Sequence, residues 1–166
     1  DPAAEKEAKV ASWTYASQGG FYWAGACIRD GFLLVGTDDG QTGYTTGYAS
    51  IVSLDTRSGR VIDQITLPRV GDQRSAISYD ADTDSYYFTT KGGQFYTVQT
   101  AQDGAFRPNS LRYLDLNNGS DSAATPAMST STPVVYNKRA YVGVSGVGQF
   151  SPYSGHNITV IDLKNW

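Results

Sequence analysis

The pattern of hydrophobic and polar residues predicts short strands separated by turns along nearly the whole chain. Residues 32–36 form a continuous apolar run between two turns, which is typical of a strand buried on both faces. Residues 10–15 alternate between apolar and polar positions, as a half-buried strand does. Amphipathic helical periodicity is nearly absent, so we expect almost no helix. The other predicted strands are residues 21–28, 50–54, 60–67, 75–79, 86–90, 94–100, 111–116, 132–136, 140–144 and 157–163.

Part of this pattern occurs three times at nearly equal spacing. A shift of 107 positions (35 to 142) places residues 34–36 on residues 141–143, and residues 51–55 on residues 158–162. A weaker copy begins at residue 85, so the copies start at positions 31, 85 and 138, in steps of 54 and 53 residues. Repeats of this length with about four strands each are typical of β-propeller blades.

We therefore predict an all-β fold of about three four-stranded antiparallel sheets, in a single partial β-propeller spanning residues 1–166. Counted from the strand that precedes each repeat, the blades cover approximately residues 8–58, 59–109 and 110–166. Closed propellers have roughly four to eight blades, so three blades predict an incomplete propeller. Either the chain is a fragment of a larger propeller, or its sheets close through another chain. A first strand that reads as the last of a preceding blade favours the fragment.

The turn at residues 53–60 has residue types that predict a structural corner. An aspartate at the start of a tight turn accepts hydrogen bonds from backbone N–H groups two or three residues later, and a glycine at its end supplies a positive φ. We therefore expect structural roles for Asp55 and Gly59. Asp115 and Asp162 stand in looser versions of the same corner.

This corner resembles the repeat of PQQ-like (quinoprotein-type) β-propellers. The positions that match that repeat or conservatively replace it are Ser53, Asp55, Ser58, Gly59 and Arg60. Asp63 stands where the family has a Trp that packs between neighbouring blades, and we interpret Trp13 as a remnant of that residue. The resemblance implies a propeller fold and, in the non-enzymatic bacterial branch of the family, a secreted or cell-surface protein.

The predicted function is a non-catalytic binding or scaffolding module of a secreted or cell-surface bacterial protein, with no cofactor. One alternative is a fragment of a PQQ-dependent dehydrogenase, in which PQQ and calcium lie on the propeller axis. The chain has no obvious constellation of Asp, Glu, Asn and Arg for that cofactor, and the single Cys27 excludes a vicinal cysteine pair. A second alternative is an outer-membrane assembly scaffold that binds other proteins.

Charge and hydropathy narrow the range of partners. A formal net charge of −3 provides no basic patch, so nucleic acid is not a predicted partner. No apolar run approaches the roughly 18 residues of a membrane span. The remaining partners are a protein or carbohydrate ligand, or the missing blades of the propeller itself. Cys27 lies in an apolar strand candidate, where we expect a buried structural thiol.

Two long loops between the second and third strands of the first and third blades carry the candidate ligand-binding residues. These are Tyr44, Tyr48, Phe150, Tyr153 and His156. Equivalent loops of successive blades lie on the same rim, and aromatic side chains there suit the recognition of sugars, peptides or a neighbouring domain. The alternative is that these loops fold back and cover blade edges.

One acidic run is a weak candidate for a metal site. Asp80, Asp82 and Asp84 alternate like the first half of a calcium loop. However, Ser85 replaces the turn glycine, and Lys91 stands where a bidentate glutamate is required, so a solvated hairpin is favoured. His156 is the only histidine, which excludes a histidine cluster for zinc or copper, and we predict no catalytic residues.

Overall fold

The computed structural model describes residues 11–40, 47–116, 128–145 and 156–166. This part of the chain contains eleven strands and no helix, which confirms the all-β prediction. The strands are β1 (Cys27–Arg29), β2 (Phe32–Gly36), β3 (Ser50–Asp55), β4 (Val61–Thr66), β5 (Ser78–Asp80), β6 (Ser85–Thr89), β7 (Gln94–Val98), β8 (Arg112–Asp115), β9 (Val134–Tyr136), β10 (Arg139–Ser145) and β11 (His156–Asp162). No helix long and apolar enough to cross a membrane occurs among the described residues.

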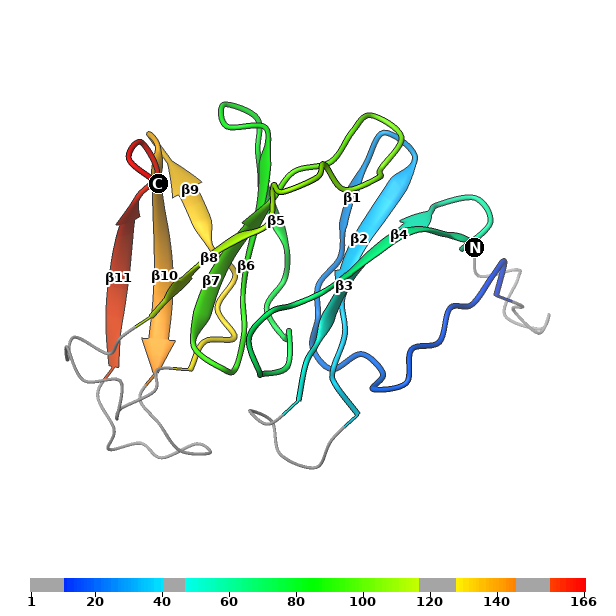
Figure 1. Cartoon of the computed structure of the whole chain (residues 1–166), viewed down its shortest axis with the longest axis horizontal. Coiled ribbons are helices and arrows are strands. Elements are labelled where there is room, and N and C mark those ends of the chain that lie inside the picture. Colours follow the sequence, from blue (N-terminus) through cyan, green and yellow to red (C-terminus); the bar gives the residue numbers. More distant parts are fainter. Residues whose placement is uncertain (1–10, 41–46, 117–127, 146–155) are drawn as a thin grey trace, which may run out of the picture.

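Three antiparallel sheets follow one another in chain order. The first contains β1 to β4, the second β5 to β8 and the third β9 to β11, and each strand pairs with the next one along the chain. The three sheets stand side by side in Figure 1. Successive meandering sheets of this size are the blades of a β-propeller, so the described residues form an incomplete propeller. The second and third blade units counted in the sequence begin with β4 and β8, the strands that close the first and second sheets.

The turns that join the strands form where the sequence places them. Asp30 and Gly31 between β1 and β2 have φ angles of 47° and 92°, and Asn137 and Lys138 between β9 and β10 have φ angles of 49° and 58°. Two central residues in the left-handed region define the tight hairpin turn that matches the twist of the flanking strands. Short local signals therefore fix the register of both hairpins.

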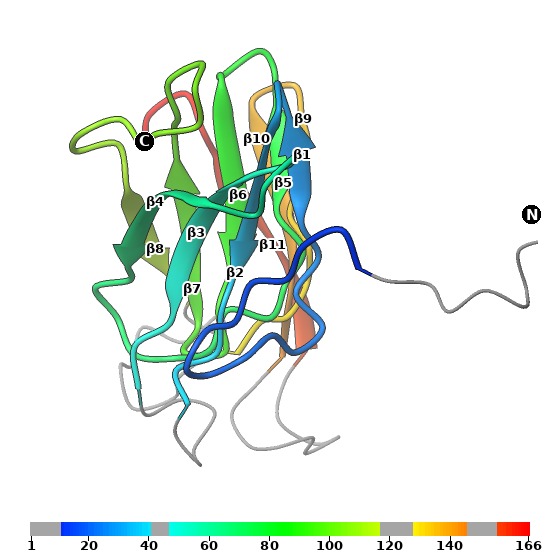
Figure 2. The same cartoon turned by 90° about the vertical axis from the view of Figure 1, so that its right-hand side faces the viewer.

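The predicted strand at residues 10–15 is wrong for residues 11–15, which pair with no strand in the described part of the chain. This segment instead crosses in front of the first sheet in Figure 2. The Trp13 indole N–H donates to the Thr56 carbonyl at 2.9 Å, and its ring leaves no room at Gly59, where a Cβ would lie 2.5 Å from Cε3. The alternating apolar side chains of this segment therefore pack on a sheet face, while its backbone joins no β-ladder. Trp13 does contact the corner, as a blade-docking tryptophan would.

The predicted strand at residues 21–28 shortens to β1, and Cys27 is half-buried instead of buried. Strand β1 is the edge of its sheet and pairs only with β2, so one side of the thiol packs on the core and the other remains accessible. Burial raises the pKa of the Cys27 thiol, which keeps it protonated and unreactive near neutral pH.

Two separate hydrophobic cores hold the three sheets together. Tyr86 and Phe88 of β6 pack with the first sheet, while Tyr87 of β6 and Phe95 of β7 pack with the third sheet. Successive side chains of a strand point to opposite faces, so an uninterrupted aromatic run fills both cores of the central sheet. All five residues of β6 are buried for this reason.

The two outer faces of the stack differ. On the first sheet, Val52 and Leu54 are buried beneath Trp13 and Tyr15. On the third sheet several outward residues are apolar and exposed, and we call these apolar residues the open face. Its most exposed members are Val134, Tyr136, Ile158 and Val160, with exposed fractions of 60%, 73%, 69% and 52%.

The buried tyrosines make the stability of the fold sensitive to alkaline pH. Burial raises the pKa of Tyr86 and, to a larger extent, that of Tyr96, so the folded chain holds these protons more tightly than the unfolded chain. Their contribution to stability is complete below the ordinary tyrosine pKa of about 10 and is lost as the pH rises from there through the higher pKa values of the folded chain. We expect phenolate absorbance to rise in at least two steps in the folded protein. A single step near pH 10 for all 12 tyrosines would contradict this.

Candidate functional site

The structure places one of the five predicted ligand-binding side chains. Tyr44, Phe150 and Tyr153 lie outside the described residues. His156 is the first residue of β11 and pairs with Ser145. Tyr48 is 57% exposed and forms an isolated bridge with Gly71, in the connection between β4 and β5. Tyr48 belongs to the connection between β2 and β3, and the end of β2 and the start of β3 lie at the lower rim in Figure 1.

Four buried charged residues gather at this lower rim, and we call them the charge network. Asp38 follows β2, Asp72 and Arg74 lie between β4 and β5, and Lys91 lies in the tight turn between β6 and β7. Their exposed fractions are 7%, 2%, 6% and 2%, in that order. Charged side chains are almost never buried this far unless they are paired.

Arg74 holds the charge network together. Its guanidinium donates two hydrogen bonds to Asp38, including Nε to Oδ1 at 3.1 Å, and Nη2 lies 2.9 Å from Asp72 Oδ2. Burial raises the pKa of Asp72, and burial with the positive Arg74 nearby lowers the pKa of Lys91. One cation thus bridges two carboxylates from separate segments, which fixes the β4–β5 connection against the end of β2.

Aromatic side chains cover this network. The ring centres of Tyr22 and Trp23 lie 4.8 and 5.5 Å from the guanidinium carbon of Arg74, within cation–π range. Tyr22 is 56% exposed and Trp23 is 65% exposed. We call Phe21, Tyr22, Trp23 and Tyr48 the aromatic rim.

Trp23 also has an unusual backbone. Its φ is 55°, in the left-handed region that a bulky residue rarely adopts. Such strain costs on the order of 1–3 kcal/mol and is concentrated at functional sites. Here the strained backbone holds the indole in solvent. Because most of the ring is exposed, Trp23 contributes little to stability through burial.

Sequence reasoning assigned residues 21–23 to a strand and did not select Asp38, Asp72, Arg74 or Lys91. Two signals could have found them. Three consecutive aromatic residues follow Gly19 and Gly20, which breaks the alternation of a strand. Two aspartates also follow directly on the buried strand at residues 32–36, at a rim where connections meet.

The Asp55 corner lies at the β3–β4 turn, at the other end of the strands from the aromatic rim. Asp115 instead pairs with Gln94 beside the β6–β7 turn, at the same rim as Lys91. Asp55 Oδ1 accepts hydrogen bonds from the Arg57 and Ser58 N–H groups at 3.1 and 2.8 Å, and from Ser58 Oγ at 2.7 Å. The hydrogen bonds from Ser58 lower the pKa of Asp55. Gly59 closes the turn with a φ of 69°. These contacts are local and support the turn.

The two looser corners make fewer contacts. Asp162 Oδ1 accepts a hydrogen bond from the Lys164 N–H at 2.9 Å, which caps the end of β11. Asp115 Oδ1 instead accepts from Gln94 Nε2 at 3.1 Å, across the β7–β8 pair. The part of its corner after residue 116 lies outside the described residues.

The acidic run at the β5–β6 turn is occupied by hydrogen bonds and ion pairs. Asp80 Oδ2 accepts from the backbone and side chain of Thr83, and Asp84 Oδ1 accepts from the Tyr79 hydroxyl at 2.9 Å. Asp82 is exposed. Within residues 11–40, 47–116, 128–145 and 156–166, no group of three or more His, Cys, Asp or Glu side chains is placed to hold a metal ion.

The sheets and their two rims define an all-β protein built of propeller blades. A crystal structure of BamB from Moraxella catarrhalis is similar to it, with a TM-score of 0.46 and 12% sequence identity over 81% of this chain and 51% of that one. The chain thus spans about half the length of the structure that it matches. No protein-family model matches the chain, and no curated protein matches it.

Proposed function

We propose that the chain is a non-catalytic binding module whose aromatic rim recognises a protein ligand. The observation that carries this proposal is Trp23, which is 65% exposed and has a left-handed backbone. Tryptophan and tyrosine are the residues most enriched at the energetic centres of protein interfaces. An exposed indole on a strained backbone does not serve stability, and binding gives both features a reason.

The charge network beneath the rim gives the aromatic side chains a rigid base. Arg74 is fixed by Asp38 and Asp72, and Tyr22 and Trp23 lie over its guanidinium. Rigid anchors lose little conformational entropy when a partner binds, which favours affinity. Buried ion pairs add little to stability compared with apolar residues, so a positioning role accounts for this network better than a stabilising one.

The proposal extends to family and location. We propose a non-enzymatic member of the PQQ-like propellers, secreted or exposed on a bacterial cell surface. It is supported by the corner at residues 53–60 and by the contact of Trp13 with Gly59 and Thr56 in that corner. Calcium- and PQQ-dependent dye reduction by the purified chain would contradict a non-catalytic role.

A second candidate is an outer-membrane assembly scaffold that binds other proteins. The open face of the third sheet favours it, because exposed apolar side chains gathered on one sheet mark protein interaction sites. This candidate places the contact on Tyr136 and Ile158, on the opposite sheet of the stack from Trp23. The two candidates therefore predict loss of binding in different variants.

A displayed library of random peptides tests the proposal. Peptides selected on the wild-type chain are expected to bind Trp23→Ala at least about tenfold more weakly, because truncation removes the central anchor. Tyr136→Ala is the matched control, since this aromatic residue is 73% exposed but lies on the open face. Equal losses in both variants, or peptides that bind Trp23→Ala normally, would refute the proposal. Loss in Tyr136→Ala alone would favour the assembly scaffold.

A further inference from the structure

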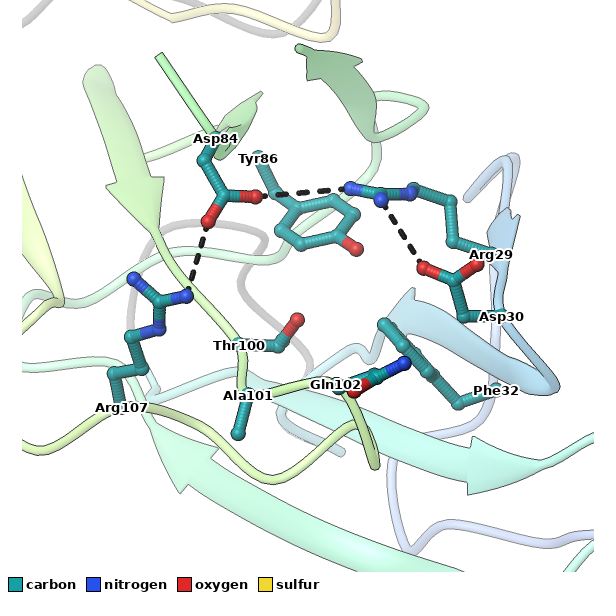
Figure 3. A pocket seen from close by; sticks show the side chains of 9 residues that line it. All are labelled: Arg29, Asp30, Phe32, Asp84, Tyr86, Thr100, Ala101, Gln102 and Arg107. Carbon is teal, nitrogen blue, oxygen red and sulfur yellow. Dashed lines mark hydrogen bonds and ion pairs between the residues drawn. The ribbon is translucent and has the colours of Figure 1, made fainter.

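A pocket of about 250 Å³ opens between the first and second sheets, at the rim opposite the aromatic rim. Figure 3 shows the side chains that line it. Its walls come from the β1–β2 turn, the β5–β6 turn and the β7–β8 connection. The polar side chains that line it include Arg29, Asp30, Asp84, Tyr86, Gln102 and Arg107. The aromatic rim lies at the other ends of the strands, so the two sites are separate.

The β7–β8 connection is held over the first sheet and gives the pocket a fixed wall. The Phe106 N–H donates to Asp63 Oδ2 at 2.9 Å. Gly104 lies against the Phe32 ring, where a Cβ would come within 2.7 Å of Cγ, and its φ of 90° favours glycine. Asp63 thus tethers this connection, at the position where the resembling repeat has a tryptophan.

Charges in the pocket balance. Asp84 lies between two guanidinium groups, with Arg107 Nη2 at 3.0 Å and Arg29 Nη1 at 3.8 Å. Arg29 Nη2 also lies 3.0 Å from Asp30 Oδ2, and its guanidinium carbon is 3.7 Å from the Tyr79 ring centre. Two positive and two negative side chains leave no excess charge to attract an ion. A neutral ligand can instead receive hydrogen bonds from the arginines and donate them to the carboxylates.

The Tyr86 hydroxyl provides an independent indication of a ligand. Tyr86 is 1% exposed, and its hydroxyl has no hydrogen-bond partner within the described part of the chain. Arg29 and Thr100 are near enough to act on its pKa, but neither satisfies the hydroxyl. Figure 3 shows this hydroxyl directed toward the middle of the ring of polar side chains. A buried hydroxyl without a partner is unfavourable, and a bound hydroxyl group would relieve it.

We propose that this pocket binds a single neutral hexose unit, such as the terminal sugar of a glycan. Sugar hydroxyls both donate and accept, which matches arginine donors and carboxylate acceptors that lie side by side. Phe32 and Ala101 offer apolar contact for the C–H groups of the ring. The volume lies just below the range of pockets for drug-sized ligands, so one ring fits and a longer glycan extends into solvent.

The test is a titration of the ¹⁵N-labelled chain with the methyl glycosides of glucose, galactose, mannose and N-acetylglucosamine. At least one glycoside is expected to shift the amide signals of Asp30, Asp84 and Gln102, with a dissociation constant of order 1 mM. Tyr86→Phe keeps the ring and removes only the hydroxyl, and is expected to weaken binding about tenfold. Tyr96→Phe is the matched control, because Tyr96 is also buried with an unsatisfied hydroxyl but does not line the pocket.

Each other outcome overturns the proposal. Glycine or inorganic phosphate shifting these signals when no glycoside does would show a site for charged ligands. Absence of shifts with all four glycosides, each added up to near its solubility limit, would show that the pocket is not a sugar site. Equal affinities of Tyr86→Phe and Tyr96→Phe for the glycoside would show that the Tyr86 hydroxyl takes no part in recognition. The amide spectrum of each variant verifies that it is folded, and none of these results depends on the peptide screen.

Discussion

Replacing Arg74 by alanine is expected to lower the free energy of unfolding by about 3–5 kcal/mol. The substitution leaves the carboxylates of Asp38 and Asp72 buried after their shared cation is removed. Lys91 is the remaining buried cation near them. Because small domains have a total stability of roughly 5–15 kcal/mol, the variant should unfold at a much lower urea concentration. Tryptophan fluorescence during urea titration measures the change.

The loss of stability in Arg74→Ala should depend on pH in a definite direction. Burial already raises the pKa of Asp72 in the wild type, so the folded chain binds its proton more tightly than the unfolded chain, and this carboxyl opposes folding as the pH rises above about 4. Without Arg74 the effect grows. The difference between the variant and the wild type should therefore be larger at pH 7 than at pH 4.

Arg69→Ala is the control for the arginine substitution. Arg69 is 49% exposed and lies 3.6 Å from Asp115, so its removal should change stability by less than about 1 kcal/mol. Equal losses in the two variants, or a loss in Arg74→Ala that does not vary with pH, would show that the buried charges are not the cause.

Replacing Phe88 by alanine should destabilise the fold by about 3–5 kcal/mol. Phe88 is fully buried in the core between the first and second sheets, and its ring stacks on Tyr96 with centroids 5.1 Å apart. Truncation leaves a cavity in this core and removes the stack. The free energy of unfolding in urea measures the loss.

Phe88→Leu keeps this prediction testable if the alanine variant does not fold. Leucine retains much of the buried volume, so the loss should be smaller than for alanine but still measurable. Leu114→Ala is the surface control, because Leu114 is 39% exposed on β8. A wild-type urea midpoint for Phe88→Leu, or a larger loss in Leu114→Ala, would contradict the assignment of the core.

The strands were predictable where their signals are local. The run at residues 32–36 is bounded by turn residues and became β2, buried nearly throughout. The Asp55 corner was also predictable, since the hydrogen bonds that the Asp55 side chain accepts all come from residues at most three positions away. Residues 11–15 have the alternation of a strand, but alternation specifies only that one side is apolar. Whether such a segment pairs with a strand or packs on the face of a sheet depends on its neighbours in space.

The residues of the charge network and of the pocket were less predictable for the same reason. Arg74 and Asp38 are 36 positions apart, and only the fold joins them. The pocket joins Arg29 at the end of β1, Asp84 of the β5–β6 turn and Gln102 of the β7–β8 connection. Asp84 was considered as a metal ligand because its neighbours in sequence are acidic, whereas its neighbours in space are two arginines. The exposure of Tyr48 was predictable because it follows from its place in a loop.

Because the two outer faces differ, the two ends of the stack of sheets are not equivalent. In repeat proteins a terminal unit whose outer face is covered stops elongation, and an uncovered unit accepts the next one. Trp13 and Tyr15 occupy the outer side of the first sheet, while Ile158 and Val160 leave the third available. A further sheet, whatever its source, therefore adds readily at the β9–β11 side. To close a ring, the last sheet must meet the first across the segment that carries these two aromatic residues.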